Sequence, residues 1–314
     1  MNLRSVACLP LEAMSSSTET DTPEVLGILY LDSTHQMHAL SGLDEKILTK
    51  LAEQAASVLE KLEMIKGLEA RKKMEQELEL AQETQRSLLP QSVPQFENYH
   101  IHAYSQPTRY VGGDFYDFLQ LGAGSWAGVL ADVSGKGISA ALLGSLVQGA
   151  LAAELRSQGD LGQVVCRVNK FLVEKSSAHR FVTMFLLRLD SEGKGEYISA
   201  GHNPAFLYRA ETGEIEELGS GGLILGAFDF AAYESHPFQL AKDDTLLVYS
   251  DGFTEAENPQ GEMMGEDRVR EILCREALSG SHVLERKLLQ GIEYFTQGRG
   301  QTDDITFLLV NRTV

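Results

Sequence analysis

Leu130-Ala-Asp-Val-Ser-Gly-Lys-Gly137 decides how this 314-residue sequence folds. An apolar run typical of a strand ends in Asp132, and a glycine turn then leads into a segment typical of a helix. Three other acidic turns occur at strand ends or tight glycine turns. They are Gly112-Gly-Asp-Phe-Tyr-Asp117, Val248-Tyr-Ser-Asp-Gly-Phe-Thr-Glu255 and Thr302-Asp-Asp-Ile-Thr306.

A single Asp-Gly pair is weak evidence for a site, because both residues are default turn formers. The combination is more informative, since strand ends at one sheet edge can bring such acids together. Two carboxylates about 4 Å apart repel by roughly 1 kcal/mol in water and about 4 kcal/mol at an effective dielectric of 20. A cluster therefore needs a counter-charge, and oxygen ligands without His or Cys favour Mg²⁺ or Mn²⁺ over Zn²⁺.

The region from about residue 95 to 314 mixes strands and helices without regular alternation. This pattern favours an α+β fold, a sandwich of antiparallel β-sheets flanked by helices. The expected strands are 127–131, 181–189, 195–199, 205–208, 245–249 and 305–310, and the expected helices are 138–157, 161–175, 266–277 and 282–298.

The first 94 residues have a different pattern. Two β-rich runs, 6–11 and 25–31, precede a long helical segment from about residue 44 to 89, which Pro90 ends. Apolar residues in this segment are spaced three and four apart, as in a coiled-coil seam: Leu48, Leu51, Ala55, Val58, Leu62 and Ile65. Two interpretations stay open, a helix that pairs with a second chain and an amphipathic helix packed on its own domain.

Composition narrows the class of protein. The chain has 27 basic and 45 acidic residues, a net charge of −18, which disfavours nucleic-acid binding because phosphate contacts need clustered Lys and Arg. We expect no stretch of about 18 apolar residues and hence no membrane span. Three dispersed cysteines suit a reducing cytoplasm better than a disulfide framework.

The four acidic turns, with two further motifs, resemble the PPM family of metal-dependent protein phosphatases in its bacterial SpoIIE/RsbU-like branch. The motifs occur in the family's order across residues 95–314. They are Val111–Asp117, Asp132–Gly137, Phe181-Val-Thr183, Ala200-Gly-His-Asn-Pro204, Tyr249–Glu255 and Asp303-Asp-Ile-Thr306.

The resemblance implies a site with two Mn²⁺ or Mg²⁺ ions. Asp132 would bridge both ions, with the Val133 backbone carbonyl as an added ligand. Asp114 and Asp251 would each supply a carboxylate, and Asp303 would close the site on the metal held by Asp251. A water activated between metals about 3.5–4 Å apart would then attack phosphorus in line.

Five further positions lie in or near these motifs. Arg109 has the spacing of the wider family's phosphate-binding arginine, although a surface arginine is the favoured interpretation. Ser134 occupies the place of a histidine that is a general-acid candidate in the wider family, so the general acid is unassigned. For His202 we favour a loop-ordering hydrogen bond over catalysis, and for Asp117 and Asp304 we favour capping or supporting hydrogen bonds.

The front of the chain resembles part of a GAF sensor domain, which often precedes this type of phosphatase. The expected division is a partial GAF-like α/β segment at 1–60, a coiled-coil-like linker helix at 61–94 and the phosphatase domain at 95–314. The linker implies a homodimer.

The resemblance as a whole implies a cytoplasmic phosphatase acting on phosphoserine or phosphothreonine of a regulatory protein, with a STAS-type anti-sigma-factor antagonist as the expected substrate. The alternative is a signalling scaffold that keeps the phosphatase fold with weak catalysis.

Overall fold

The computed structural model describes residues 5–13, 24–33, 42–90, 92–122, 124–157, 159–175, 180–219 and 221–314. The chain divides into two compact units, Met1–Glu77 and Leu78–Val314. The division falls within the long helix α1 (Gly42–Leu88), so the last turns of that helix belong to the second unit.

The first unit contains the two expected strands and most of the expected helix. Strands β1 (Ser5–Glu12) and β2 (Val25–Ser33) pair antiparallel. Leu11 packs with Ala52 and Ala56 of α1, and all three side chains are buried. Small residues on the helix allow the strands to approach closely, so this face of α1 is already covered within the unit.

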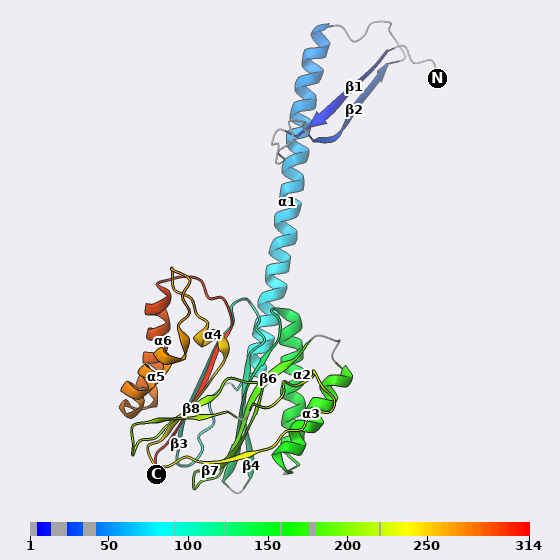
Figure 1. Cartoon of the computed structure of the whole chain (residues 1–314). Helices are drawn as coiled ribbons and strands as arrows, with labels where there is room; N and C mark the ends of the chain where they lie inside the picture. Colours follow the sequence, from blue (N-terminus) through cyan, green and yellow to red (C-terminus); the bar gives the residue numbers. More distant parts are fainter. Residues whose placement is uncertain are drawn as a thin grey trace. The chain divides into compact units, whose positions relative to one another are not determined.

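The second unit contains two five-stranded sheets, and every strand pairing in them is antiparallel, as predicted (Figure 1). One sheet has the order β10-β7-β6-β5-β4, and the other has the order β3-β12-β11-β8-β9. The strands are β3 (Tyr99–Gln106), β4 (Phe115–Gly122), β5 (Ser125–Val133), β6 (Val182–Leu189), β7 (Lys194–Ala200), β8 (Ala205–Tyr208), β9 (Ile215–Leu218), β10 (His236–Gln239), β11 (Thr245–Tyr249) and β12 (Ile305–Arg312).

The central strands are buried on both faces, which explains their continuous apolar runs. In β5, Trp126 and Leu130 point into the core between the sheets, whereas Val129 and Ala131 point to the outer face, where helices cover the sheet. Since side chains alternate along a strand, Asp132 falls on the same side as Leu130, at the end of the strand between the sheets.

Helices cover the outer face of each sheet (Figure 1). On one sheet lie α2 (Ile138–Leu155) and α3 (Leu161–Lys175). Beside the other lie α5 (Gly265–Glu276) and α6 (Ser281–Thr296), joined by the short helix η1 (Ala277–Ser279), and α4 (Asp251–Thr254) follows β11. The predicted sandwich flanked by helices is therefore confirmed.

One expectation about hydropathy is wrong. Within the described residues, α2 is the one helix long and apolar enough to cross a membrane by length and composition. Its Val147 and Leu151 are buried against Phe115 and Ala131 of the sheet, so core packing accounts for part of its hydropathy, whereas Leu142 on the same helix is 66% exposed.

Four strands were missed in the sequence: β3, β4, β9 and β10. Each places polar side chains on one face, such as His100 and His102 in β3 and Asp117 in β4. All four lie at an edge of their sheet. Edge strands lack the continuous apolar runs that identified the buried central strands.

Candidate metal centre at one end of the sandwich

Strand pairing brings the four acidic turns to the same end of the second unit. Phe115 pairs with Ala131, so Asp114 and Asp132 are the next residues along the β4–β5 ladder. In the other sheet Tyr249 pairs with Phe307, and the Ser250 amide donates to the Thr306 carbonyl at 2.9 Å. Asp251 and Asp303–Asp304 flank that pair.

Two glycines let these turns approach one another through their backbones. A Cβ on Gly113 would lie 2.7 Å from the Val133 carbonyl oxygen, and a Cβ on Gly252 would lie 2.1 Å from the Asp304 carbonyl oxygen. Both distances are shorter than any van der Waals contact. The glycine beside Asp114 and the glycine after Asp251 are therefore required by packing.

Asp304 anchors the loop that carries Asp114. One of its oxygens, Oδ1, accepts hydrogen bonds from the Thr108 amide (2.7 Å) and hydroxyl (3.0 Å), and Oδ2 accepts from the Gly113 amide (2.7 Å). Asp117 likewise accepts from the Phe118 amide and the Gln148 side chain. The expected supporting hydrogen bonds of Asp304 and Asp117 are thus confirmed.

The carboxylates raise one another's pKa values. Burial, followed by the charge of Asp251, raises the pKa of Asp132 to about 6. Burial and the charge of Asp132 raise the pKa of Asp114 well above its ordinary range, although the hydroxyls of Ser250 and Thr306 partly offset this. Burial and the charge of Asp303 raise the pKa of Asp251. The site therefore concentrates negative charge, which a bound cation would balance.

This donor set fits a hard divalent cation. Asp114 is only 5% exposed, and its Oδ2 atom is buried without a hydrogen-bond partner. An ionised carboxylate oxygen with no partner is costly to bury, and a cation relieves that cost. The surrounding donors, carboxylates and the Val133 carbonyl, are all oxygens, the ligands that Mg²⁺ and Mn²⁺ prefer.

Lys136, in the glycine turn that follows Asp132, is also a member of this site. Its ammonium group lies 2.9 Å from Asp303 Oδ2 and donates to the Thr302 carbonyl at 2.7 Å. Glu255 belongs to the same group, since burial and the charges of Asp251 and Asp303 raise its pKa and the charge of Lys136 lowers it. Lys136 therefore supplies part of the counter-charge at Asp303.

The end of α1 also contacts the site, which sequence reasoning missed. The Gln85 side chain donates to the Gly112 carbonyl (2.8 Å) and accepts from the Gly112 amide (3.2 Å). A cavity of about 30 Å³ beside this contact is lined by residues that include Gln85, Asp114 and Asp304. Glutamine is common on helix surfaces, so no sequence signal distinguished Gln85 from its neighbours.

The remaining candidate residues have varied surroundings. Arg109 is exposed and adjoins Thr108, whose amide binds Asp304. Ser134 is structural, since its hydroxyl accepts from the Phe181 amide at 2.9 Å. The His202 Nδ1 atom lies 2.9 Å from the Thr183 hydroxyl, and burial lowers the His202 pKa to about 4. A neutral, hydrogen-bonded His202 agrees with the loop-ordering role.

The family follows from comparison with known proteins. A family model described as Stage II sporulation protein E (SpoIIE) matches residues 122–313, which include Asp132, Asp251 and Asp303. This chain belongs to the SpoIIE family. It is 30% identical over 245 residues to the phosphoserine phosphatase RsbU of Bacillus subtilis (strain 168), and the match covers 76% of this chain and 70% of RsbU.

Solved structures agree on the fold of this SpoIIE-family protein. The SiaA-PP2C domain of Pseudomonas aeruginosa superposes with a TM-score of 0.69 at 23% identity, covering 78% of this chain and 99% of that domain. RsbX in complex with magnesium gives a TM-score of 0.52 at 17% identity, covering 71% of this chain and 99% of RsbX. The protein is therefore a serine/threonine phosphatase of the metal-dependent PP2C/PPM type.

Proposed function

We propose that this phosphatase removes phosphate from serine or threonine of a regulatory protein in the cytoplasm, with a STAS-type anti-sigma-factor antagonist as the substrate. The observation that carries the proposal is the meeting of four acidic turns around Asp132, beside Asp114, whose buried Oδ2 atom has no hydrogen-bond partner. The substrate class rests on the resemblance to the SpoIIE/RsbU-like branch.

We assign the ligands as follows. Asp132 would hold both cations, and the Val133 carbonyl would be an added ligand. Asp114 would hold one cation, and Asp251 with Asp303 would hold the other. Bound Mn²⁺ or Mg²⁺ supplies a nucleophilic water near neutral pH and stabilises charge on the phosphoryl oxygens. Asp304 keeps Asp114 in place through its hydrogen bonds to Gly113 and Thr108.

Substrate phosphate would reach the site from the exposed side. Arg109 is exposed in the loop that Asp304 anchors, and a guanidinium suits bidentate phosphate contact. Lys136 is 47% exposed at its side chain while it pairs with Asp303, so it can approach an incoming phosphate as well. The general acid stays unassigned, because Ser134 is engaged by the Phe181 amide.

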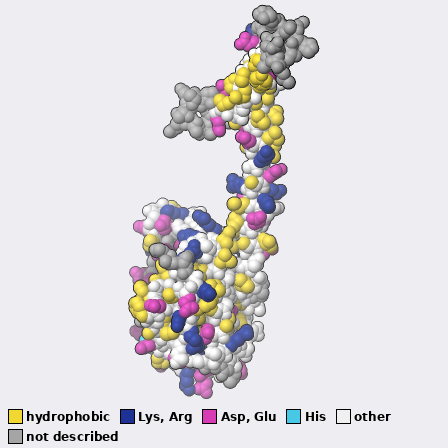
Figure 2. All heavy atoms as spheres, turned by 90° about the vertical axis from the view of Figure 1, so that its right-hand side faces the viewer, with side chains coloured by type: hydrophobic (Ala, Val, Ile, Leu, Met, Phe, Trp, Pro, Cys, Tyr) yellow, Lys and Arg dark blue, Asp and Glu magenta, His cyan; other side chains and the backbone are white. Residues whose placement is uncertain are grey.

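Regulation would come from the front of the chain, a partial GAF-like sensor at 1–60 followed by the linker at 61–94. The seam residues Leu51, Val58, Leu62 and Ile65 are each at least 48% exposed, and Figure 2 shows hydrophobic side chains on the surface of α1. A second copy of this helix would cover them in a homodimer. A Leu62→Lys variant that sediments like the wild-type protein would contradict this pairing.

The activity is tested by phosphate release from two substrates, a phosphorylated STAS-domain protein and a generic aryl phosphate. We expect release with Mn²⁺ and its loss on adding chelator, because the proposed nucleophile is a water that the bound cations activate. The STAS-domain protein with its phosphorylated serine replaced by alanine is the control. Metal-dependent release from the aryl phosphate alone would contradict the substrate class, and no release from either would favour the scaffold alternative.

A further inference from the structure

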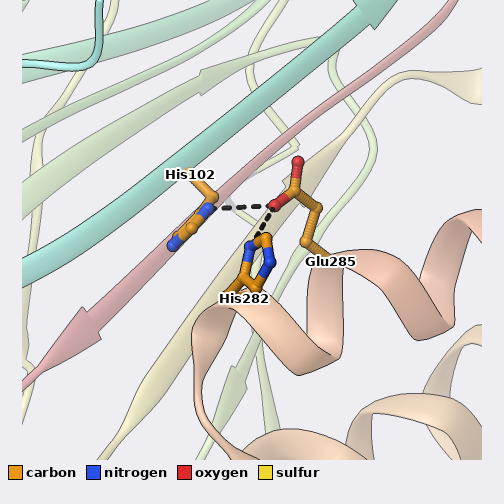
Figure 3. A group of neighbouring side chains, drawn as sticks. All are labelled: His102, His282 and Glu285. Carbon is orange, nitrogen blue, oxygen red and sulfur yellow. Dashed lines mark hydrogen bonds and ion pairs between the residues drawn. The ribbon is translucent and has the colours of Figure 1, made fainter.

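A second group of possible metal ligands lies away from the aspartate cluster. It is on the outer face of the sheet that contains β3 and β12. His102 comes from strand β3, and His282 and Glu285 come from the start of α6 (Figure 3). Ile101 on β3 points into the core between the sheets, so His102 points to the opposite face, toward α6. His282 and Glu285 are three residues apart, which puts them on one side of the helix.

The three side chains converge on a single point. His102 Nδ1 lies 3.0 Å from Glu285 Oε2, and His282 Nδ1 lies 3.5 Å from the same oxygen. All three ligand atoms lie within 4.8 Å of one another. Bonds of 2.0–2.1 Å to a tetrahedral zinc ion place neighbouring ligand atoms about 3.3 Å apart. The two observed distances bracket that value, and His282, whose side chain is 80% exposed, is free to turn inward.

The site also has room for a further ligand. His102 and His282 both line a surface hollow of about 660 Å³, together with His100 and the loop before α6. Three protein ligands and an open position for water form a familiar arrangement for zinc. Two imidazoles and one carboxylate form a mixed nitrogen and oxygen set, which suits Zn²⁺ and is poorly suited to Mg²⁺.

We propose that His102, His282 and Glu285 bind one Zn²⁺ ion at a site separate from the phosphatase centre. The ion would join α6 to β3, whose neighbour β12 begins directly after Asp303 and Asp304. An ordinary histidine–glutamate ion pair is the competing explanation. It accounts for the His102 contact and, as a pair three residues apart on one helix, for the His282 contact, so zinc binding itself is the observation that separates the two explanations.

The test uses the full chain, stripped by chelator and then held in excess Mg²⁺ so that the aspartate cluster is occupied. Zn²⁺ is added, and zinc retained per chain is measured by elemental analysis after desalting. We expect the wild-type protein to retain one more zinc per chain than His282→Ala, or to bind it at least tenfold more tightly. Replacing Zn²⁺ by Co²⁺ should give intense tetrahedral absorption bands that His282→Ala lacks.

The variants are chosen so that a null result is informative. The exposure of His282 means that its replacement leaves the fold intact, and His236→Ala, on the other sheet, is the matched control that should behave as wild type. Zinc should also raise the melting temperature of the wild-type protein by roughly 5 °C, and of His282→Ala by much less. Equal zinc content and affinity in wild type and His282→Ala, or no zinc in either, would overturn the proposal.

Discussion

The two ligand clusters of the second unit are built in opposite ways. The aspartate cluster draws on four separate turns, and glycines at 113 and 252 bring its backbones into direct contact. The imidazole cluster needs only one strand and one turn of helix, and its side chains reach across to one another. In the aspartate cluster, backbone geometry fixes the ligands, and a bound cation would relieve the repulsion between their charges. In the second, the ligands are pre-paired and carry little excess charge.

The largest effect that separates the two clusters is expected from Asp251→Asn. An amide has nearly the same shape as a carboxylate but lacks its charge, so the fold should persist while cation binding is lost. We expect metal-dependent phosphate release to fall at least ~10³-fold, the scale of losing a principal electrostatic contribution. The measurement is kcat with Mn²⁺, with circular dichroism as the check on folding.

The same variant tests whether the clusters are independent. Zinc retention in excess Mg²⁺ should be unchanged in Asp251→Asn and lost in His282→Ala, whereas phosphate release should show the reverse. Near-normal turnover by Asp251→Asn would refute the aspartate site as drawn.

Sequence reasoning found the aspartate cluster because its ligands follow buried, continuous apolar strands and sit beside obligatory glycines. Asp251 has both signals, whereas Asp132 follows an apolar strand and Asp114 adjoins Gly113. Gln85 and Lys136 have none, since long polar side chains next to a site resemble any others in sequence. His102 and Glu285 are 183 residues apart and meet only through the packing of α6 on an edge strand that was itself missed.

A second prediction concerns the charge that the aspartate cluster carries without metal. The pKa of Asp132 in the fold is about 6, above its usual 3.8, so between pH 4 and 6 the unfolded chain binds fewer protons than the folded chain. The contribution of Asp132 to the free energy of unfolding therefore falls as pH rises through that window. The fall is at most roughly 3 kcal/mol for a shift of this size. Mg²⁺ removes the repulsion, so it should stabilise the protein more at pH 7 than at pH 5.

Urea midpoints with Mg²⁺ and with chelator, at both pH values, measure this difference. Buried His202 acts in the opposite sense, because its pKa is lowered to about 4, but its effect is common to both conditions and cancels in the comparison. The imidazole cluster should add nothing to this Mg²⁺ response, because its mixed nitrogen and oxygen ligands suit Zn²⁺ rather than Mg²⁺. Equal stabilisation by Mg²⁺ at the two pH values would contradict the charge assignment.

The smallest effect is expected at Gln85, which touches the aspartate cluster only through Gly112. Its amide donates to the Gly112 carbonyl and accepts from the Gly112 amide, so it holds the loop before Asp114 by two hydrogen bonds, each worth about 1 kcal/mol. Gln85→Ala should weaken Mn²⁺ binding several-fold with little change in kcat at saturating metal. Gln85→Glu should weaken Mn²⁺ binding further, because a carboxylate cannot donate to the carbonyl and adds negative charge near Asp114 and Asp304.

Gln82→Ala, one turn earlier and lining the same cavity, is the matched control. If Gln85→Glu bound Mn²⁺ as tightly as the wild-type protein, the end of α1 would have no effect on metal binding. The position of Asp114 would then depend on Asp304 alone.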